Sequence, residues 1–135
     1  MKTVLQSSVD ETGQALIPED LQGALAELDK VLPQSLKADI AARGSEGQHF
    51  ALGEWIRNTW GLWGMGNTER DLALRKYFLL RGLTRADEMS RSVIEAYQFH
   101  LRGEPVIELP LLVGEDLQRA LTRIAIPEFL RKYPD

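Results

Sequence analysis

The stretch Gln48–Trp63, QHFALGEWIRNTWGLW, holds all three tryptophans of this 135-residue chain. At about 100° per residue, one broad arc of a helix collects its apolar residues, and the other side is polar. The apolar arc contains Leu52, Trp55, Ile56, Thr59, Trp60, Leu62 and Trp63, and the polar side contains Glu54, Arg57 and Asn58. Each buried tryptophan removes roughly 150–250 Å² from water. We therefore expect this helix to lie at the centre of the fold, with the other helices packed against it. The predicted core residues are Trp55, Ile56, Trp60, Trp63 and, from another helix, Tyr97.

The composition is that of one globular domain, with 44% hydrophobic and 27% charged residues. No apolar run approaches the ~20 residues of a membrane helix, and the stretch MKTVLQSSVDETG has no signal-peptide core. The absence of cysteine excludes disulfides, thiolate metal sites and cysteine nucleophiles. We expect a cytoplasmic protein with no membrane partner.

The net charge of -4 is unevenly distributed. Residues 1–30 carry two lysines against six acids, and the rest of the chain is neutral overall. The pattern contains no cluster of Lys and Arg of the kind that binds a phosphate backbone, so we expect no nucleic-acid partner. The acidic N-terminal third fits a solvated face, with contact to a basic protein as the alternative.

Residues 18–103 are predicted to form a helical core. Apolar periodicity, prolines and capping residues place four helices around the tryptophan helix: Pro18–Val31, Pro33–Arg43, Glu69–Arg81 and Arg85–Arg102. Thr68 with Asp71, and Thr84 with Asp87, match capping boxes that would start the last two. Glu69–Arg81 is apolar nearly all round, so it is either central in the fold or a protein interface on one side.

Both ends of the chain are predicted to be less regular. Residues 1–17 form an arm or a short β-hairpin that turns at Gly13. In residues 104–135, the stretch EPVIELPLLVG contains two prolines and is expected to lie extended across the helices. A helix over Glu115–Ala125 follows, which Pro127 should end. The expected fold is mainly α: a single domain over 1–135 with five to six helices.

No catalytic constellation stands out. The two histidines, His49 and His100, lie in different helices without the paired spacing of a metal site, and no nucleotide-binding or nucleophile motif is present. His100 falls within the apolar arc of its helix, which favours a hydrogen-bonded core histidine. We expect no catalytic residue, no metal and no cofactor.

Two sets of residues are candidates for binding. Arg57 and Asn58 lie on the polar side of the tryptophan helix, where an arginine could grip a carboxylate; the alternative is an internal ion pair or a stack on Trp60 or Tyr97. Phe99 falls on the polar side of its helix among Glu88, Glu95 and Arg102. An aromatic rimmed by charge is typical of a binding anchor, although singly exposed apolar residues are also common.

The motif W-I-R-N-x-W-G-L-W, followed by a helix with D-E-M-S and Y-x-x-x-L-x-G, resembles an uncharacterised family of small bacterial proteins. The matching residues are Gly53, Trp55, Ile56, Arg57, Asn58, Trp60, Gly61, Leu62 and Trp63, then Asp87, Met89, Ser90, Ile94, Tyr97, Leu101 and Gly103. The resemblance covers about residues 25–105. It implies a helical domain and supplies no activity. By analogy, small proteins of this type resemble immunity proteins, which bind and block toxins.

The leading hypothesis is a non-catalytic protein-binding protein, most specifically a bacterial immunity protein that neutralises a toxin by direct binding. The second is a small-molecule or peptide-binding module that uses Arg57, Asn58 and Tyr97, and the third is an enzyme of an unrecognised kind. A concave site lined by Trp60, Arg57 and Tyr97 would favour the second hypothesis. A flat, acidic surface with an apolar centre would favour the first.

Overall fold

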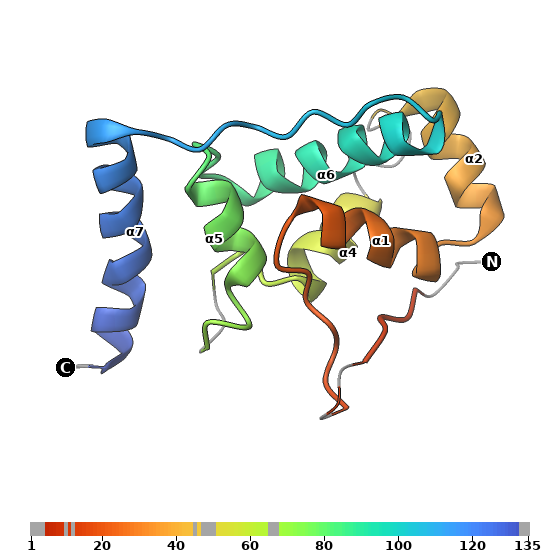
Figure 1. Cartoon of the computed structure of the whole chain (residues 1–135). Helices are drawn as coiled ribbons and strands as arrows, with labels where there is room; N and C mark the ends of the chain where they lie inside the picture. The colour runs from red at the N-terminus through yellow and green to blue at the C-terminus, as the bar shows by residue number, and fades with distance from the viewer. Residues whose placement is uncertain are drawn as a thin grey trace.

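The computed structural model describes residues 5–9, 11, 13–44, 46, 51–64 and 68–132. Within these ranges the chain is mainly α, with six helices and no assigned strand (Figure 1). The helices are α1 (Leu21–Val31), α2 (Gln34–Arg43), α4 (Ala51–Thr59), α5 (Ala73–Leu79), α6 (Ala86–Leu101) and α7 (Gly114–Lys132). The prediction of a mainly α fold with five to six helices is confirmed. Every helix in the described part of the chain is too short or too polar to cross a membrane.

Helix α6 connects the other helices of the core. α1, α2, α4 and α5 each pack against it, and it runs through the middle of the molecule (Figure 1). It is 16 residues long, against nine for α4, and its buried residues are Ala86, Met89, Ser90, Val93, Ile94, Ala96 and Tyr97. The small residues among them let neighbouring helices approach closely on more than one side. The tryptophan helix is predicted to be the centre of the fold, whereas in the structure α6 is the helix that the others share as a packing surface.

The tryptophan helix supplies the largest buried side chain. Trp60 and Ile56 are fully buried, and Trp55 is partly buried with its ring edge-to-face on Trp60 at 5.7 Å. The prediction that Trp63 belongs to the core is wrong, because 52% of it is exposed. α4 ends at Thr59, and Gly61 has a φ of 69°, so Trp63 leaves the arc that a continuous helix would give it. The predicted start of this helix at Gln48 and His49 lies outside the described residues.

The helix starts show which capping signals the fold uses. α1 begins at Leu21 rather than at Pro18, because the Asp20 side chain accepts the N–H of Gly23 at 2.8 Å. Thr68 accepts the N–H of Asp71 as predicted, but this caps a turn, and α5 begins only at Ala73. The predicted cap at Thr84 is wrong: the residue before α6 is Arg85, which makes no side-chain cap.

Helix α5 is packed on two sides, as its nearly uniform apolar character predicted. It lies between α6 and α7 and contacts both (Figure 1). Its buried residues are Leu74, Tyr77, Phe78 and Leu79. The two apolar sides of α5 therefore pack against other helices of the same chain.

The described residues of the N-terminal arm, 5–9, 11 and 13–17, precede α1 and are joined by one antiparallel bridge between Val9 and Ala15. Gly13 turns the chain with a φ of 84°, at the predicted position. The arm is held by the buried carboxylate of Glu27, which accepts the N–H of Ser8 at 2.8 Å. On its other side, Arg70 donates to the carbonyl of Ala15 at 2.5 Å.

Residues 104–113 cross the molecule as an extended segment that runs back along α6 and ends at α7 (Figure 1). Leu112 donates its N–H to the carbonyl of Leu80 at 2.9 Å, which ties the segment to the end of α5. Among the described helices, α7 packs mainly on α5. The prediction that Pro127 ends this helix is wrong, since α7 continues to Lys132.

Candidate functional site

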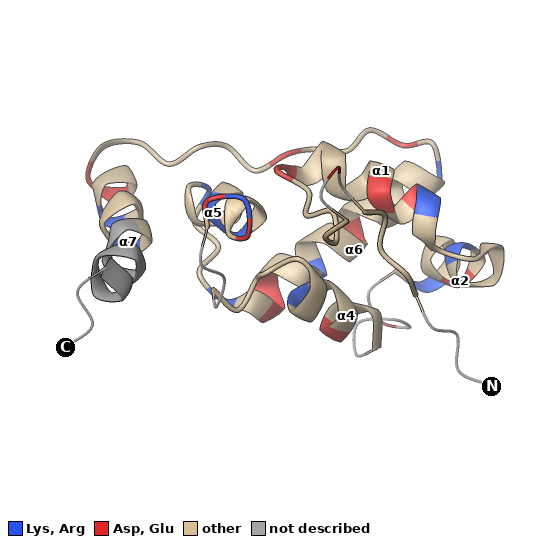
Figure 2. Cartoon of the chain, turned by 90° about the horizontal axis from the view of Figure 1, so that it is seen from below, with Lys and Arg blue, Asp and Glu red and all other residues tan. Residues whose placement is uncertain are grey.

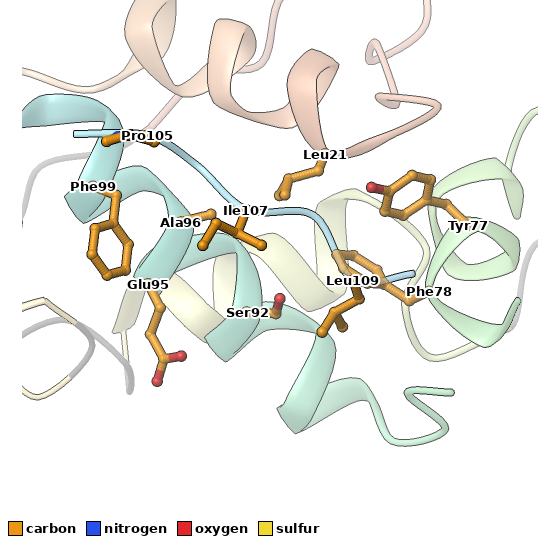
Figure 3. A pocket seen from close by; sticks show the side chains of 10 residues that line it. All are labelled: Leu21, Tyr77, Phe78, Ser92, Glu95, Ala96, Phe99, Pro105, Ile107 and Leu109. Atoms are coloured by element: carbon orange, nitrogen blue, oxygen red, sulfur yellow. The ribbon is translucent and has the colours of Figure 1, made fainter. Parts of the chain in front are cut away.

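An apolar groove lies between α6 and the extended segment, and Phe99 stands at one end of it (Figure 3). We call it the Phe99 groove. Its volume is about 220 Å³, and it is lined by Leu21, Tyr77, Phe78, Ser92, Glu95, Ala96, Phe99, Pro105, Ile107 and Leu109. Figure 3 shows Phe99 and Glu95 projecting from α6, with Ile107 and Leu109 on the segment that crosses the groove. Four separate parts of the chain therefore build this surface.

A polar contact fixes the extended segment beside the groove. The hydroxyl of Tyr77 donates a hydrogen bond to the carboxylate of Glu108, which fastens the middle of the extended segment to α5. The guanidinium of Arg81 stacks on the Tyr77 ring, 3.7 Å from its centroid. Burial, and then the hydrogen bond to Glu108, raise the pKa of Tyr77 well above its ordinary value. The phenol of Tyr77 therefore stays neutral at physiological pH and keeps donating its hydrogen bond to Glu108.

The extended segment that crosses the groove carries an exposed apolar side chain at every odd position from 107 to 113. We call this row the outer strip: Ile107 is 88% exposed, Leu109 40%, Leu111 56% and Val113 77%. Single exposed apolar residues are ordinary, but a contiguous row beside an exposed phenylalanine is typical of a contact surface. The charged residues of segment 104–113 are acidic only (Figure 2). The strip was not predicted, although aliphatic residues occupy every odd position from 107 to 113 in VIELPLLV.

The structure brings some predicted partner-binding residues together and separates others. Phe99 is exposed, and Glu95 lies beside it in the groove lining, as expected. Glu88 is exposed on the same helix but does not line the groove. Glu88 lies seven residues before Glu95, roughly 10 Å away along the helix axis. It can therefore act on a partner at this surface only through its electrostatic field.

Arg57 and Asn58 line a second, shallower pocket of about 380 Å³, together with Ile17, Thr59, Gly61, Trp63 and Asp71. Asn58 accepts a hydrogen bond from the indole N–H of Trp63 at 2.8 Å, and Arg57 lies 5.6 Å from the centroid of that ring. Arg57 also donates to the buried hydroxyl of Ser90 at 2.9 Å and lies 3.7 Å from Asp87. The arginine thus joins α4 to α6 and holds Trp63 against the surface.

Tyr97 does not belong to this second pocket, contrary to the expectation that it joins Arg57 and Asn58. It is fully buried, and its hydroxyl donates to Asp29 of α1 at 2.9 Å. Tyr97 is two helical turns beyond Ser90, the α6 residue that Arg57 contacts, so the two side chains serve different neighbours of α6. Trp60 is also fully buried and lines neither pocket.

His100 is hydrogen-bonded as predicted but is not a core residue. Its Nε2 lies 2.7 Å from the second oxygen of Asp29, on an exposed part of the surface. The described residues contain no group of three or more His, Cys, Asp or Glu that could hold a metal ion. Half of the six acids of the N-terminal third have roles in the fold, because Asp20 caps α1, Glu27 is buried and Asp29 binds Tyr97 and His100.

A comparison with protein-family models identifies the family of this chain. Residues 17–101 match the model of a family described as Domain of unknown function (DUF6794). The chain belongs to this family. The DUF6794 match runs from the end of the arm to the end of α6, so it includes the Arg57–Trp63 pocket and Phe99 and excludes the extended segment and α7. No curated protein and no solved structure matches the chain.

Proposed function

We propose that this DUF6794 protein is a non-catalytic protein-binding protein and that the Phe99 groove with the outer strip is its contact surface. The observation that carries the proposal is the contiguous apolar row at Phe99, Ile107 and Leu109, with Glu95 at its rim. An apolar centre with a charged rim is the usual anatomy of a protein interface. The groove is too small for a typical ligand of drug size, which favours a side chain of a protein partner as its occupant.

The most specific form of the proposal is a bacterial immunity protein that neutralises a cognate toxin by masking it in the cytoplasm. Support for this form comes from the resemblance to small proteins that accompany toxins, and from a rim in which Glu95 and Glu108 favour a basic partner. Association with a basic toxin surface would be accelerated by these charges and slowed by salt.

The test is a titration of the purified chain against the product of a toxin gene adjacent to its own. Phe99→Ala should weaken binding by roughly 1–3 kcal/mol and leave the melting temperature nearly unchanged. Leu121→Ala is the matched control, because Leu121 of α7 is 41% exposed against 44% for Phe99 but lies outside the groove. Charge reversal at Glu95 should slow association more than the same change at Glu88. If Phe99→Ala binds the toxin like wild type, the groove is not the contact surface.

A second candidate is a small-molecule or peptide site at the Arg57–Trp63 pocket. The half-exposed indole of Trp63, held by Asn58 beside the cationic Arg57, favours it. A ligand there would change the fluorescence of Trp63, and the change would be lost in Trp63→Phe and kept in Phe99→Ala. Binding that depends on Phe99 and not on Trp63 would count against this candidate.

A further inference from the structure

We propose that the Arg57–Trp63 pocket binds a neutral saccharide, with one sugar ring stacked on the indole of Trp63. This names the ligand class of the second candidate function above, on which it rests. It is independent of the Phe99 groove, because the two sites have no lining residue in common. The indole is 52% exposed, and exposure alone is ordinary for a single apolar residue. What distinguishes Trp63 is that side chains and backbone both fix its ring.

Two polar side chains of α4 hold the exposed indole. Its N–H donates to Oδ1 of Asn58 at 2.8 Å, and the guanidinium carbon of Arg57 lies 5.6 Å from the ring centroid, within the range of a cation–π contact. Arg57 is itself held on α6 by Ser90, to whose hydroxyl it donates at 2.9 Å. The ring is therefore preorganised, so a ligand that stacks on it loses little free energy to ordering it.

The turn that carries the indole is also fixed by α5 and the segment that leads into it. Gly61 and Gly64 have φ angles of 69° and 79°, which favour glycine. A Cβ at Gly61 would collide with the carbonyl oxygen of Asp71, and a Cβ at Gly64 would lie 2.8 Å from Nε of Arg75. Arg75 also donates to the carbonyl of Leu62 at 2.8 Å. One left-handed glycine is enough to end a helix, whereas the second, held against Arg75, fixes the direction in which the indole projects.

The side chains around the indole offer both donors and acceptors of hydrogen bonds. Because an indole N–H can only donate, the oxygen of the Asn58 amide must face it, and the NH₂ group remains a donor on the other side. Thr59 contributes a hydroxyl and Asp71 a carboxylate to the lining of the pocket. A sugar hydroxyl both donates and accepts, so it can pair with each of these groups.

The charges at the pocket are balanced within the chain, which argues against an ionic ligand. Arg57 lies 3.7 Å from Asp87, and Asp71 lies 3.4 Å from Arg70. A planar aromatic ligand would cover the indole but leave the covered polar groups of the rim unpaired, which weakens binding. A saccharide combines a face of C–H groups, suited to the electron-rich face of an indole, with an edge of hydroxyls suited to the rim. It therefore fits both parts of the pocket.

The size of the pocket sets the expected ligand and affinity. Its volume of about 380 Å³ lies at the lower end of the range for ligand sites, which suits a mono- or disaccharide. A shallow site with one stacking ring predicts dissociation constants in the millimolar range. Because the ligand is neutral, added salt should leave its affinity unchanged, whereas salt should slow association with a basic toxin.

The first test is protection of Trp63 from quenching by acrylamide. Trp60 is fully buried and Trp55 partly buried, so Trp63 is the tryptophan most open to the quencher. The probes are four neutral disaccharides: cellobiose, lactose, mannobiose and N,N′-diacetylchitobiose. At least one of them should lower the quenching constant by about twofold or more, because a stacked sugar covers the ring. Glycerol, a polyol without a ring face, should give no protection at the same concentration.

Saturation-transfer NMR with the same disaccharides measures binding to variants that lack the indole. Trp63→Ala should abolish the signal, and Trp63→Phe, which keeps a smaller aromatic face, should weaken binding by about tenfold. Both variants should keep the circular dichroism spectrum of wild type, because this ring lies at the surface. Asn58→Ala releases the indole and should weaken binding by a similar factor of about ten. Leu121→Ala, a change at an exposed apolar residue outside both sites, should bind like wild type.

Three outcomes would overturn the saccharide site. They are a lack of protection by all four disaccharides, equal signals from wild type and Trp63→Ala, and protection of Trp63 by a peptide when no disaccharide protects it. The last outcome would leave the second candidate function standing. The toxin titration above uses none of these probes, so a failure of the saccharide site and a failure of the Phe99 contact surface are read from separate measurements.

Discussion

Trp60 and Trp63 are three residues apart, yet the first is fully buried and the second is half exposed. Replacing Trp60 with Ala should lower the free energy of unfolding by roughly 3–5 kcal/mol, because it leaves a large cavity beside Trp55 and α6. Trp63→Ala should cost less than about 1 kcal/mol, since it removes a surface contact. Urea-induced unfolding of the two variants measures the difference. Similar losses from both would contradict the separation of these tryptophans into core and surface.

The contrast also shows how far the sequence can predict single residues. Helical periodicity is sufficient for Trp60 and Ile56, because both lie within the regular helix or directly after it. Trp63 depends on the left-handed Gly61, where an added Cβ would lie 2.2 Å from the carbonyl oxygen of Asp71. No local pattern in the sequence reports a contact of that kind. The position of Tyr97 likewise depends on Asp29, a partner that lies in a different helix.

Tyr97 should make the folded chain less stable at alkaline pH. Burial, and then the hydrogen bond to Asp29, raise its pKa above the ordinary value of about 10. A folded-state pKa above the unfolded one means that this contribution is complete below about pH 10 and is lost as the pH rises toward the folded-state pKa. Wild type should therefore lose stability above about pH 10 more steeply than Tyr97→Phe, measured by urea unfolding at about pH 8 and 11. Tyr77 titrates in the same direction in both proteins, so parallel slopes would exclude Tyr97 as the cause.

At the scale of an element, the N-terminal arm depends on one buried acid in α1. Glu27 is 1% exposed, and of its two oxygens only the one bound to the Ser8 N–H has a partner among the described residues. Glu27→Ala should free this N–H, so the Ser8 amide should exchange with solvent at least about tenfold faster. Glu27→Gln is the control, because its amide oxygen can still accept the bond. Unchanged Ser8 exchange in Glu27→Ala would show that the contacts of Arg70 suffice to hold the arm.

The helices themselves were predictable in number and order, and their ends were less so. Apolar periodicity identifies α1 and α6 because each buries several residues of its apolar face, whereas α2 buries only Ile40 and α5 is apolar on two sides. The Thr84 cap fails because tertiary packing of Ala86 and Met89, both buried, sets the start of α6 without it. The Phe99 groove could be predicted only in part. Its polar-side phenylalanine is visible in the sequence, but the segment that completes it returns along α6 through a tertiary path.

For the whole molecule, the packing predicts an uneven distribution of stability. α6 is packed against four helices, whereas α7 packs mainly on α5, and among its described side chains, those of residues 114–124, Ala120 is the buried one. Its contact also brings Arg123 close to Arg75, where burial and then the positive charge of Arg123 lower the pKa of Arg75. Two arginines that repel one another reduce what the packing of α7 contributes.

We therefore expect α7 to open without unfolding the rest of the chain. In native-state hydrogen exchange, α6 amides should exchange only through global unfolding, and α7 amides should exchange with a free energy several kcal/mol lower. Arg123→Gln removes the repulsion with Arg75 and should slow exchange in α7 selectively, while Arg119→Gln, an exposed arginine one turn away with acidic neighbours on its own helix, should not. If α6 and α7 exchanged with equal free energies in wild type, the molecule would be a single cooperative unit and α7 would be as firmly held as the family core at residues 17–101.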